Sequence, residues 1–239
     1  MNVFVLTDNR YLYENFKQLT ARSPHSFDFY HSPASQALFH DLSGNAGIHP
    51  IRLSEQPEAF FSQYDVFFSL HSKQIFPEKL VCSHRCINVH PGFNPYNRGW
   101  FPQVHSILNK LPAGVTIHEM DAELDHGPII VQQPVEILES DTSYDVYSKI
   151  QQLELQLLER YLDMLVTGNY QSTPMRTEGN IQYKADFDRL CALDLDRVGT
   201  FREFYDLLRA TTFAGYDNAY FYDRNGDKVF VSLRIKRQP

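Results

Sequence analysis

The stretch Asp65-Val66-Phe67-Phe68-Ser69-Leu70 is almost entirely apolar, and Val3-Phe4-Val5-Leu6 near the amino terminus is a second run of the same kind. Short continuous apolar runs are typical of strands that are buried on both faces of a mostly parallel sheet. An amphipathic segment, residues 9–19, follows the first run, and neither of its ends carries a clear cap. Strands that alternate with such segments predict an α/β fold built on an open, mostly parallel, twisted sheet.

The turn after the first strand excludes one large class of α/β enzymes. It reads Thr7-Asp8-Asn9-Arg10-Tyr11 and lacks the Gly-x-Gly-x-x-Gly sequence on which a dinucleotide pyrophosphate rests. We therefore expect a Rossmann-like sheet without the dinucleotide fingerprint, and a Rossmann oxidoreductase is disfavoured.

A long helix is expected in the second half of the chain. Thr142 and Asp145 form an imperfect capping box at its start, and Gly168 supplies a stop. Apolar residues recur at helical spacing between these ends, so this helix is expected to pack on the sheet.

The carboxyl-terminal part has helix and hairpin signals of its own. Thr200 and Glu203 form a capping box, and Asn225-Gly226 between alternating apolar residues predicts a β-hairpin. We therefore predict a catalytic domain at residues 1–180 and a small helix-plus-hairpin module at residues 181–239. The residues expected on the inner face of its helix are Phe201, Phe204, Leu207 and Leu208.

Composition limits the class of protein. A chain of 239 residues with 43% hydrophobic content can bury a full core, and no apolar run reaches membrane-spanning length. The net charge of -7 disfavours nucleic acid as a partner, because phosphate binding requires basic surface. The amino terminus has no basic leader, and the sparse cysteines Cys82, Cys86 and Cys191 are typical of reduced thiols. We expect a cytoplasmic protein that does not associate with membranes.

Three polar residues follow or end apolar runs and form a set suited to acyl transfer. Asn88 and His90 are two residues apart, so on a strand their side chains project from the same face. Open α/β sheets bind ligands at the carboxyl ends of their strands, where both side chains can reach one reacting carbonyl. Asp125, on a later loop, can orient and charge the imidazole, because a carboxylate partner raises the pKa of a histidine. The set supports a tetrahedral intermediate and contains no covalent nucleophile.

Other chemistries find less support. Cys82, His84 and Cys86 are close together, but no second ligand cluster accompanies them, so we predict no metal site. Ser83 and Cys86 are nucleophiles by type, yet neither lies in a nucleophile-elbow sequence.

The segments Asn88-x-His90, Pro95-x-x-Arg98-Gly99 and Asp125-x-Gly127-Pro128-Ile129 resemble the folate-dependent formyltransferase family. The matched segments span residues 67–133, and within the family the chain most resembles the sugar N-formyltransferases. Residues 69–77, residues 90–100 and parts of the carboxyl-terminal module carry this closer likeness.

The resemblance implies a reaction and a set of site residues. It implies transfer of a formyl group from 10-formyltetrahydrofolate to a dTDP-linked amino-dideoxy sugar, with dTDP-4-amino-4,6-dideoxyglucose as the first candidate. Asn88, His90 and Asp125 match the catalytic triad of the family. The residues implied for the folate side are Leu70, His71, Gln74, Ile75, Asp121 and Leu124. Those expected on the nucleotide-sugar side are Lys73, Phe93, Asn94, Tyr96, Arg98 and Trp100, since cations suit a diphosphate and aromatic rings suit a base or sugar face.

Several alternatives stay open from the sequence. The acceptor can be another amine, or water, which would make the protein a formyltetrahydrofolate hydrolase. A non-enzymatic folate-binding protein whose hairpin mediates assembly is a further reading. The sequence does not fix the epimer of the sugar, the position of its amino group (3 or 4) or the glycan that receives it. The protonation of His90 is also left open. The resemblance suggests a bacterial surface polysaccharide such as the O-antigen, and we expect a homodimer.

Overall fold

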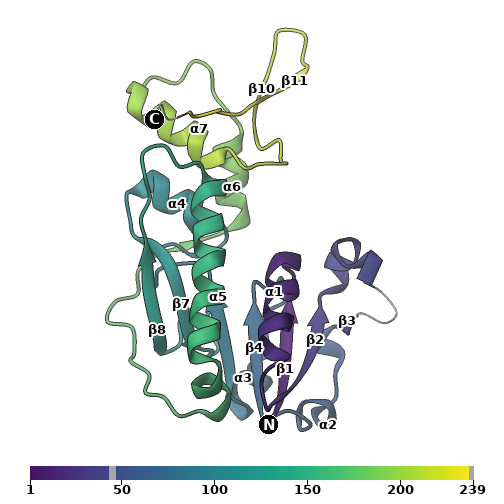
Figure 1. Ribbon diagram of the computed structural model, residues 1–239. Coiled ribbons are helices and arrows are strands. Elements are labelled where there is room, and N and C mark those ends of the chain that lie inside the picture. The colour runs from purple at the N-terminus through teal and green to yellow at the C-terminus, as the bar shows by residue number, and fades with distance from the viewer. Residues whose placement is uncertain (43–46, 237–239) are drawn as a thin grey trace. The chain divides into compact units, whose positions relative to one another are not determined.

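A computed structural model describes residues 1–42 and 47–236 of the chain (Figure 1). Within these residues seven strands form one open sheet in the order β3-β2-β1-β4-β5-β7-β8. The pairs from β3 to β5 are parallel, whereas β7 runs antiparallel to β5. The predicted mostly parallel α/β sheet is therefore confirmed. Its strands are β1 (Asn2–Thr7), β2 (Ser26–His31), β3 (Ile48–Pro50), β4 (Val66–Leu70), β5 (Cys86–His90), β7 (Ala113–Glu119) and β8 (Ile129–Val135).

The two apolar runs form the centre of this sheet. They become β1 and β4, which lie side by side in parallel, and every residue of β4 is buried. Phe4 of β1 stacks on Tyr30 with 4.8 Å between ring centroids and contacts Phe67 at 5.2 Å. Burial of each such ring contributes roughly 1.5–3 kcal/mol, so the register of these strands is fixed by an aromatic core.

The helices begin where local sequence satisfies their free amide groups. Asn9 caps α1 by accepting a hydrogen bond from the Leu12 amide, a cap that the sequence did not make clear. Thr142 precedes α5 and forms the predicted capping pair with Asp145 in its first turn, and Gly168 follows the helix with φ 78°. The helices are α1 (Arg10–Thr20), α2 (Glu58–Phe61), α3 (Glu78–Ser83), α4 (Pro102–Asn109), α5 (Ser143–Thr167), α6 (Lys184–Cys191) and α7 (Phe201–Thr211), and the 3-10 turns are Pro33–Leu38, His40–Leu42 and Leu53–Glu55.

The described chain folds into two compact units. Unit 1 consists of Met1–His90, Thr116–Gln132 and Gln151–Arg176. Unit 2 consists of Pro91–Val115, Gln133–Ile150 and the chain from Thr177 onward. The functional boundary expected near residue 180 stays a prediction. Within the described residues, no helix combines the length and the apolar character needed to cross a membrane.

The carboxyl-terminal hairpin and helix form as predicted, with one error. Strands β10 (Ala219–Tyr222) and β11 (Lys228–Val231) pair antiparallel around the predicted turn. Phe201, expected to face inward, is 86% exposed. The buried stripe of α7 is centred on Leu207 and Ala210, and at about 100° per residue Phe201 lies almost opposite that centre.

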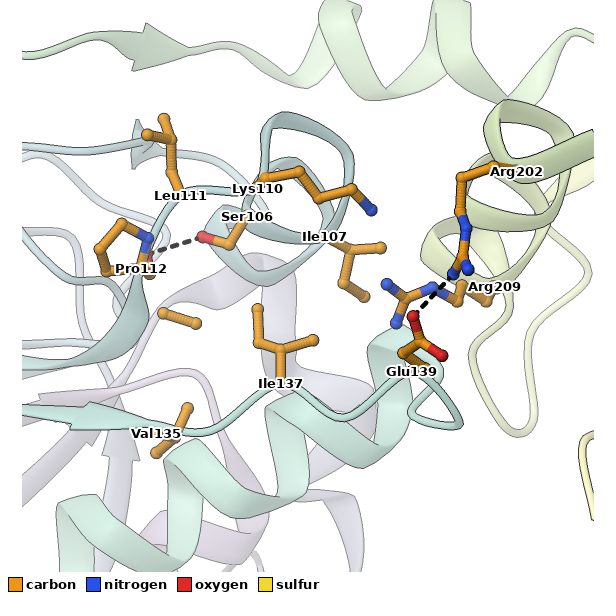
Figure 2. A pocket seen from close by; sticks show the side chains of 11 residues that line it. Ser106, Ile107, Lys110, Leu111, Pro112, Val135, Ile137, Glu139, Arg202 and Arg209 are labelled. Carbon is orange, nitrogen blue, oxygen red and sulfur yellow. Dashed lines mark hydrogen bonds and ion pairs between the residues drawn. The ribbon is translucent and has the colours of Figure 1, made fainter. Parts of the chain in front are cut away.

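A buried ionic network fixes α7 within unit 2. The carboxylate of Asp206 accepts hydrogen bonds from Lys110 at 2.5 Å and from Arg209 at 2.7 Å. Arg209 also donates to the backbone carbonyl of Asp141 at 2.9 Å. Lys110, Arg209 and Glu139 line a cavity of about 580 Å³, where Glu139 pairs with Arg202 (Figure 2). Asp206 and Arg209 therefore lie on the buried face of α7, where the apolar pattern placed Phe201.

Candidate active site

Asn88 and His90 lie at the end of β5, between β4 and β7. Asn88 pairs with Ser69 of β4 and with His118 of β7, and it is 9% exposed, whereas His90 is 4% exposed. Both side chains project from the same face of the strand, because successive side chains of a strand point to opposite faces. The end of a central parallel strand is the position at which open α/β sheets bind their ligands.

Asp125 reaches these two residues from the loop between β7 and β8. Its Oδ1 accepts a hydrogen bond from Asn88 Nδ2 at 2.8 Å, and its Oδ2 lies 3.4 Å from His90 Nδ1. Asp125 has a left-handed backbone with φ 50°, a conformation that Asp tolerates better than most residues. The three side chains that the sequence singled out are therefore brought together in unit 1.

A fourth residue, His118, belongs to the same cluster and was missed from the sequence. Its Nδ1 lies 2.6 Å from the carbonyl oxygen of Glu119, and its Nε2 lies 3.3 Å from Asn88 Nδ2. Because a carbonyl oxygen only accepts, Nδ1 carries the proton and Nε2 accepts from the Asn88 amide. Burial lowers the pKa of His118 in spite of the nearby Asp125, so the ring stays neutral. The signal in the sequence was the polar Thr116 and His118 alternating with apolar residues of β7.

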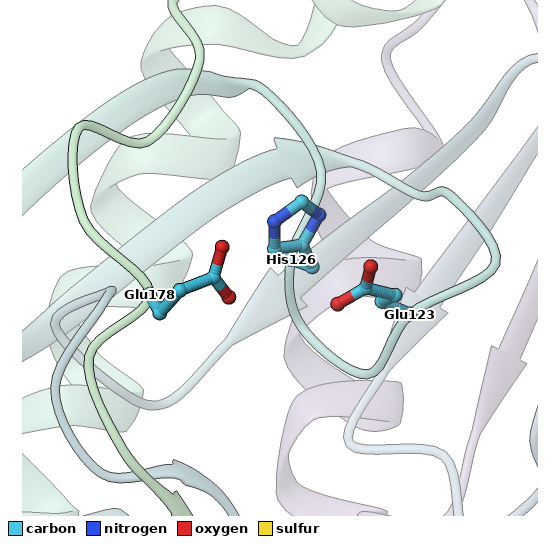
Figure 3. A group of neighbouring side chains, drawn as sticks. All are labelled: Glu123, His126 and Glu178. Atoms are coloured by element: carbon cyan, nitrogen blue, oxygen red, sulfur yellow. The ribbon is translucent and has the colours of Figure 1, made fainter.

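The loop that carries Asp125 is pressed closely against β7. A Cβ atom added to Gly127 would lie 2.8 Å from the carbonyl carbon of Glu119 and would overlap its oxygen, so only glycine fits there. The predicted folate-side residue Asp121 pairs with His126 at 2.7 Å. Leu124, the other one on this loop, is 42% exposed. Figure 3 shows Glu123 and His126 on this same loop.

The predicted folate-side residues that follow β4 include one histidine in a closed hydrogen-bond chain. Asn9 Oδ1 accepts from the Leu12 amide, so its Nδ2 faces His71 Nδ1 at 3.3 Å and donates to it. The His71 proton is then on Nε2, which donates to Glu154 Oε1 at 2.7 Å. Glu154 is fully buried, and burial raises its pKa. Both ring nitrogens of His71 are therefore engaged inside unit 1.

Gln74 is engaged in the same way. Its Oε1 accepts from the Leu53 amide at 3.0 Å, and its Nε2 donates to the Ile51 carbonyl at 2.9 Å. The backbone amide of Lys73 donates to Asp8 at 2.6 Å. Leu70 is buried at the end of β4, whereas Ile75 is 85% exposed. The side chains of His71 and Gln74 thus hold the loop in place, and Ile75 presents an apolar surface on it.

The candidate nucleotide-sugar residues other than Lys73 lie on one loop of unit 2. Asn94 and Arg98 are buried, Phe93 and Tyr96 are half-buried, and Trp100 is 39% exposed. Arg98 Nη2 lies 4.0 Å from the Glu178 carboxylate. This loop combines one cation with several aromatic rings, which is a composition suited to a phosphate joined to a ring system.

Comparison with known proteins agrees with this architecture. The model of the formyl transferase family matches residues 62–162, and that of an N-formyltransferase dimerization C-terminal domain matches residues 186–237. A dTDP-4-amino-4,6-dideoxyglucose formyltransferase of Mycobacterium tuberculosis is 42% identical over 236 residues, which cover 99% of this chain and 97% of that protein.

Two solved structures are similar along the whole chain. A 4-N formyltransferase from Francisella tularensis has a TM-score of 0.95 and 44% identity, covering 99% of this chain and 98% of that one. A sugar N-formyltransferase from Shewanella has a TM-score of 0.94 and 40% identity, covering 100% and 99% of the two chains. The fold is thus that of an α/β group-transfer enzyme. The chain belongs to the formyl transferase family, in its sugar N-formyltransferase branch.

Proposed function

We propose that this enzyme transfers the formyl group of 10-formyltetrahydrofolate to the 4-amino group of dTDP-4-amino-4,6-dideoxyglucose. The observation that carries the proposal is the contact of Asp125 with both Asn88 and His90 at the end of β5. The identity of 42% along the whole of a relative named for this sugar supports the choice of acceptor.

The reaction needs one new carbon–nitrogen bond and the loss of another. The sugar amine attacks the formyl carbon, whose oxygen becomes an oxyanion in the tetrahedral intermediate. Asn88 and a protonated His90 stabilise that charge, and each such donor contributes roughly 10²–10³ in rate. The intermediate then expels the folate N10, and the proton released by the amine reaches N10 through Asp125 and His90.

Asn88 must keep one N–H available for the formyl oxygen. Its Nδ2 has two hydrogens, of which one is donated to Asp125 at 2.8 Å. The second reaches His118 across 3.3 Å, a longer contact that the developing oxyanion can replace. Charged acceptors form the stronger hydrogen bond, so the exchange becomes favourable as the intermediate forms.

On the folate side we propose two surfaces of unit 1. One is the loop after β4 with Leu70, His71, Gln74 and Ile75, and the other is the loop with Asp121 and Leu124. Since the polar atoms of His71 and Gln74 have partners within the protein, these two residues fix the loop, while Ile75 and Leu124 contribute exposed apolar surface.

On the sugar side we propose one loop of unit 2, whereas Lys73, which belongs to unit 1, stays a prediction from the sequence. Arg98 binds the diphosphate, Tyr96, Phe93 and Trp100 contact the base or sugar faces, and Asn94 provides a hydrogen bond. The cationic and aromatic composition of these residues supports this assignment.

We also propose that the enzyme is a cytoplasmic homodimer in surface-polysaccharide biosynthesis. The match of residues 186–237 to a dimerization domain supports the dimer. Within this matched segment Val198 is 96% exposed, Phe201 86% and Tyr222 62%, so apolar side chains are available for a contact with a second copy. Light scattering at micromolar concentration should give twice the mass of the chain, and a monomer would contradict this assignment.

The direct test is to incubate the protein with 10-formyltetrahydrofolate and dTDP-4-amino-4,6-dideoxyglucose and to follow the sugar nucleotide by mass spectrometry. We expect the product to carry one formyl group in place of a hydrogen. His90→Ala should abolish the product, whereas His49→Ala, which removes an exposed histidine of β3, should not. Formylation of the 3-amino isomer alone would keep the chemistry and change the acceptor. Release of tetrahydrofolate without any formylated sugar would indicate a hydrolase instead.

A further inference from the structure

A short segment of unit 2, residues 178–182, lies alongside the loop of residues 95–100. Its last two residues form β9 (Ile181–Gln182), which pairs in parallel with β6 (Arg98–Gly99). The Arg98 amide donates to the Asn180 carbonyl at 3.0 Å, and the Trp100 amide donates to the Gln182 carbonyl at 2.9 Å. The backbone of the candidate sugar loop therefore depends on a segment that is distant in the sequence.

Asn180 makes four hydrogen bonds to this loop. Besides its carbonyl contact with Arg98, its own amide donates to the Pro95 carbonyl at 3.2 Å. Its side-chain Oδ1 accepts from the Asn97 amide at 2.9 Å, and its Nδ2 donates to Asn97 Oδ1 at 2.8 Å. The side-chain orientation is unambiguous because the Asn97 N–H can only donate. One residue thus holds three positions of the loop.

Both side-chain hydrogen bonds of Asn180 run to Asn97, which has an uncommon backbone conformation. Asn97 has a left-handed backbone with φ 52°, is fully buried, and lies between Tyr96 and Arg98. Asparagine adopts this conformation more readily than most residues, and hydrogen bonds to its amide and its side chain fix it here. Two hydrogen bonds with the Asn180 side chain restrain Asn97, and its own side chain also contacts Ser106 at 3.2 Å and Asn109 at 3.3 Å.

The neighbour of Asn180 explains how the two segments approach so closely. Gly179 has φ 65°, and a Cβ atom there would lie 2.6 Å from Pro95 Cβ and would overlap the Pro95 carbonyl oxygen. Only glycine lets Asn180 come within reach of the loop.

We infer that Asn180 is a positioning residue for binding of the nucleotide sugar, acting through the backbone of residues 95–98. It holds the turn from which Tyr96 and Arg98 project, and so it sets where a phosphate and a ring can be bound. The inference rests on the proposed function for the assignment of this loop to the sugar nucleotide. It adds a residue outside the loop on which acceptor affinity depends.

The test is to compare Asn180→Ala with the wild-type enzyme in steady-state kinetics and in calorimetric titration with dTDP alone. Loss of two side-chain hydrogen bonds should raise the KM for the dTDP sugar and the Kd for dTDP about tenfold. The KM for 10-formyltetrahydrofolate and the kcat at saturating sugar should stay within about twofold, because the reacting atoms are not displaced.

Two further variants make the result specific. Asn218→Ala removes one side-chain hydrogen bond to the Thr211 carbonyl elsewhere in unit 2 and should leave both sugar constants unchanged. Asn180→Asp keeps the acceptor for the Asn97 amide and should show a smaller loss of affinity; it replaces the alanine variant if that one does not fold.

Arg98→Ala separates the two possible failures. If Arg98→Ala weakens dTDP binding while Asn180→Ala binds as tightly as the wild type, the positioning role is overturned and the proposed function stands. If Arg98→Ala leaves dTDP binding unchanged, the assignment of this loop to the nucleotide is wrong. Equal losses in both substrate constants and in kcat for Asn180→Ala would also overturn the inference, because they would indicate general loss of structure.

Discussion

Gly127 offers a way to displace the carboxylate of the cluster without changing any of its chemical groups. A Cβ atom at this position would lie 2.8 Å from the carbonyl carbon of Glu119. Non-bonded carbon atoms prefer about 3.5–4.0 Å, so Gly127→Ala must move the loop by about 1 Å. The loop is held against β7 by the Glu119 amide, which donates to the Pro128 carbonyl at 2.9 Å, and Asp125 is only two residues away.

The expected effects on stability and on activity differ in size. Forcing one methyl group against backbone atoms costs about 1–3 kcal/mol of stability. Each kcal/mol lost lowers the Tm of a chain of this length by about 2–4 °C. A shift of about 1 Å would break the Asn88–Asp125 hydrogen bond, and a misplacement of that size lowers kcat/KM about 100-fold. The expected signature of Gly127→Ala is therefore a modest fall in Tm with a large fall in kcat/KM.

The assay measures kcat/KM by formation of the formylated sugar and Tm by thermal unfolding. Gly168→Ala is the control variant, because its φ of 78° strains any residue that carries a Cβ atom. That variant should lose a similar amount of stability and keep its kcat/KM, since it lies after α5 and away from Asp125. If Gly127→Ala unfolds earlier but keeps kcat/KM within about threefold of the wild type, the position of Asp125 does not govern the reaction.

Three buried groups give predictions about pH. Burial alone would raise the pKa of Asp206, but hydrogen bonds from two cations lower it. The ionised carboxylate therefore stabilises the fold above about pH 4, and this stabilisation is lost as the pH falls further. Asp206→Asn should lower the Tm at pH 7 and flatten the decline of the Tm between about pH 5 and 3. Burial raises the pKa of Glu154, so its contribution is present below about pH 4.3 and is lost as the pH rises through the folded-state pKa. Glu154→Gln should therefore gain in Tm relative to the wild type between about pH 5 and 8, and an unchanged difference would contradict a buried carboxyl that resists ionisation. Burial lowers the pKa of His118, so the wild type should lose Tm as the pH falls below about 6.5, and His118→Gln should lose less and show about tenfold lower kcat/KM.

The fold was predictable where one local pattern decides the outcome. The short apolar runs of β1 and β4 predict strands that are buried on both faces of the sheet, and the structure places them there. The capping pair at Thr200 and the Asn225-Gly226 turn likewise fix α7 and the hairpin from within a few residues. Phe201 was misplaced because apolar character alone does not indicate which face is buried when Asp206 and Arg209 satisfy each other's charge inside.

The candidate site was predictable only in part. The residue types of Asn88, His90 and Asp125, and the spacing of the first two, indicate chemistry. Their contact partners, however, depend on how the strands pair in the folded chain. His118 meets Asn88 because β7 runs antiparallel to β5 in one particular register. Asn180 lies in a polar segment with no periodicity. Its four hydrogen bonds to residues 95–98 depend on the close approach of two segments that are distant in the sequence, which no local pattern predicts.

The surroundings of Asp125 bear on the charge of His90, which the sequence left open. Two imidazoles lie near this carboxylate: His90 Nδ1 at 3.4 Å and His118 Nε2 at 3.9 Å. His118 cannot take a second proton without losing the hydrogen bond that it accepts from Asn88, and burial already lowers its pKa. In the proposed reaction the cationic role therefore falls to His90, which lies closer to Asp125 than His118 does. Before the reaction His118 holds the Asn88 amide, and this hydrogen bond gives way to the oxyanion as the proposed intermediate forms, while Asp125 keeps its contacts with both Asn88 and His90.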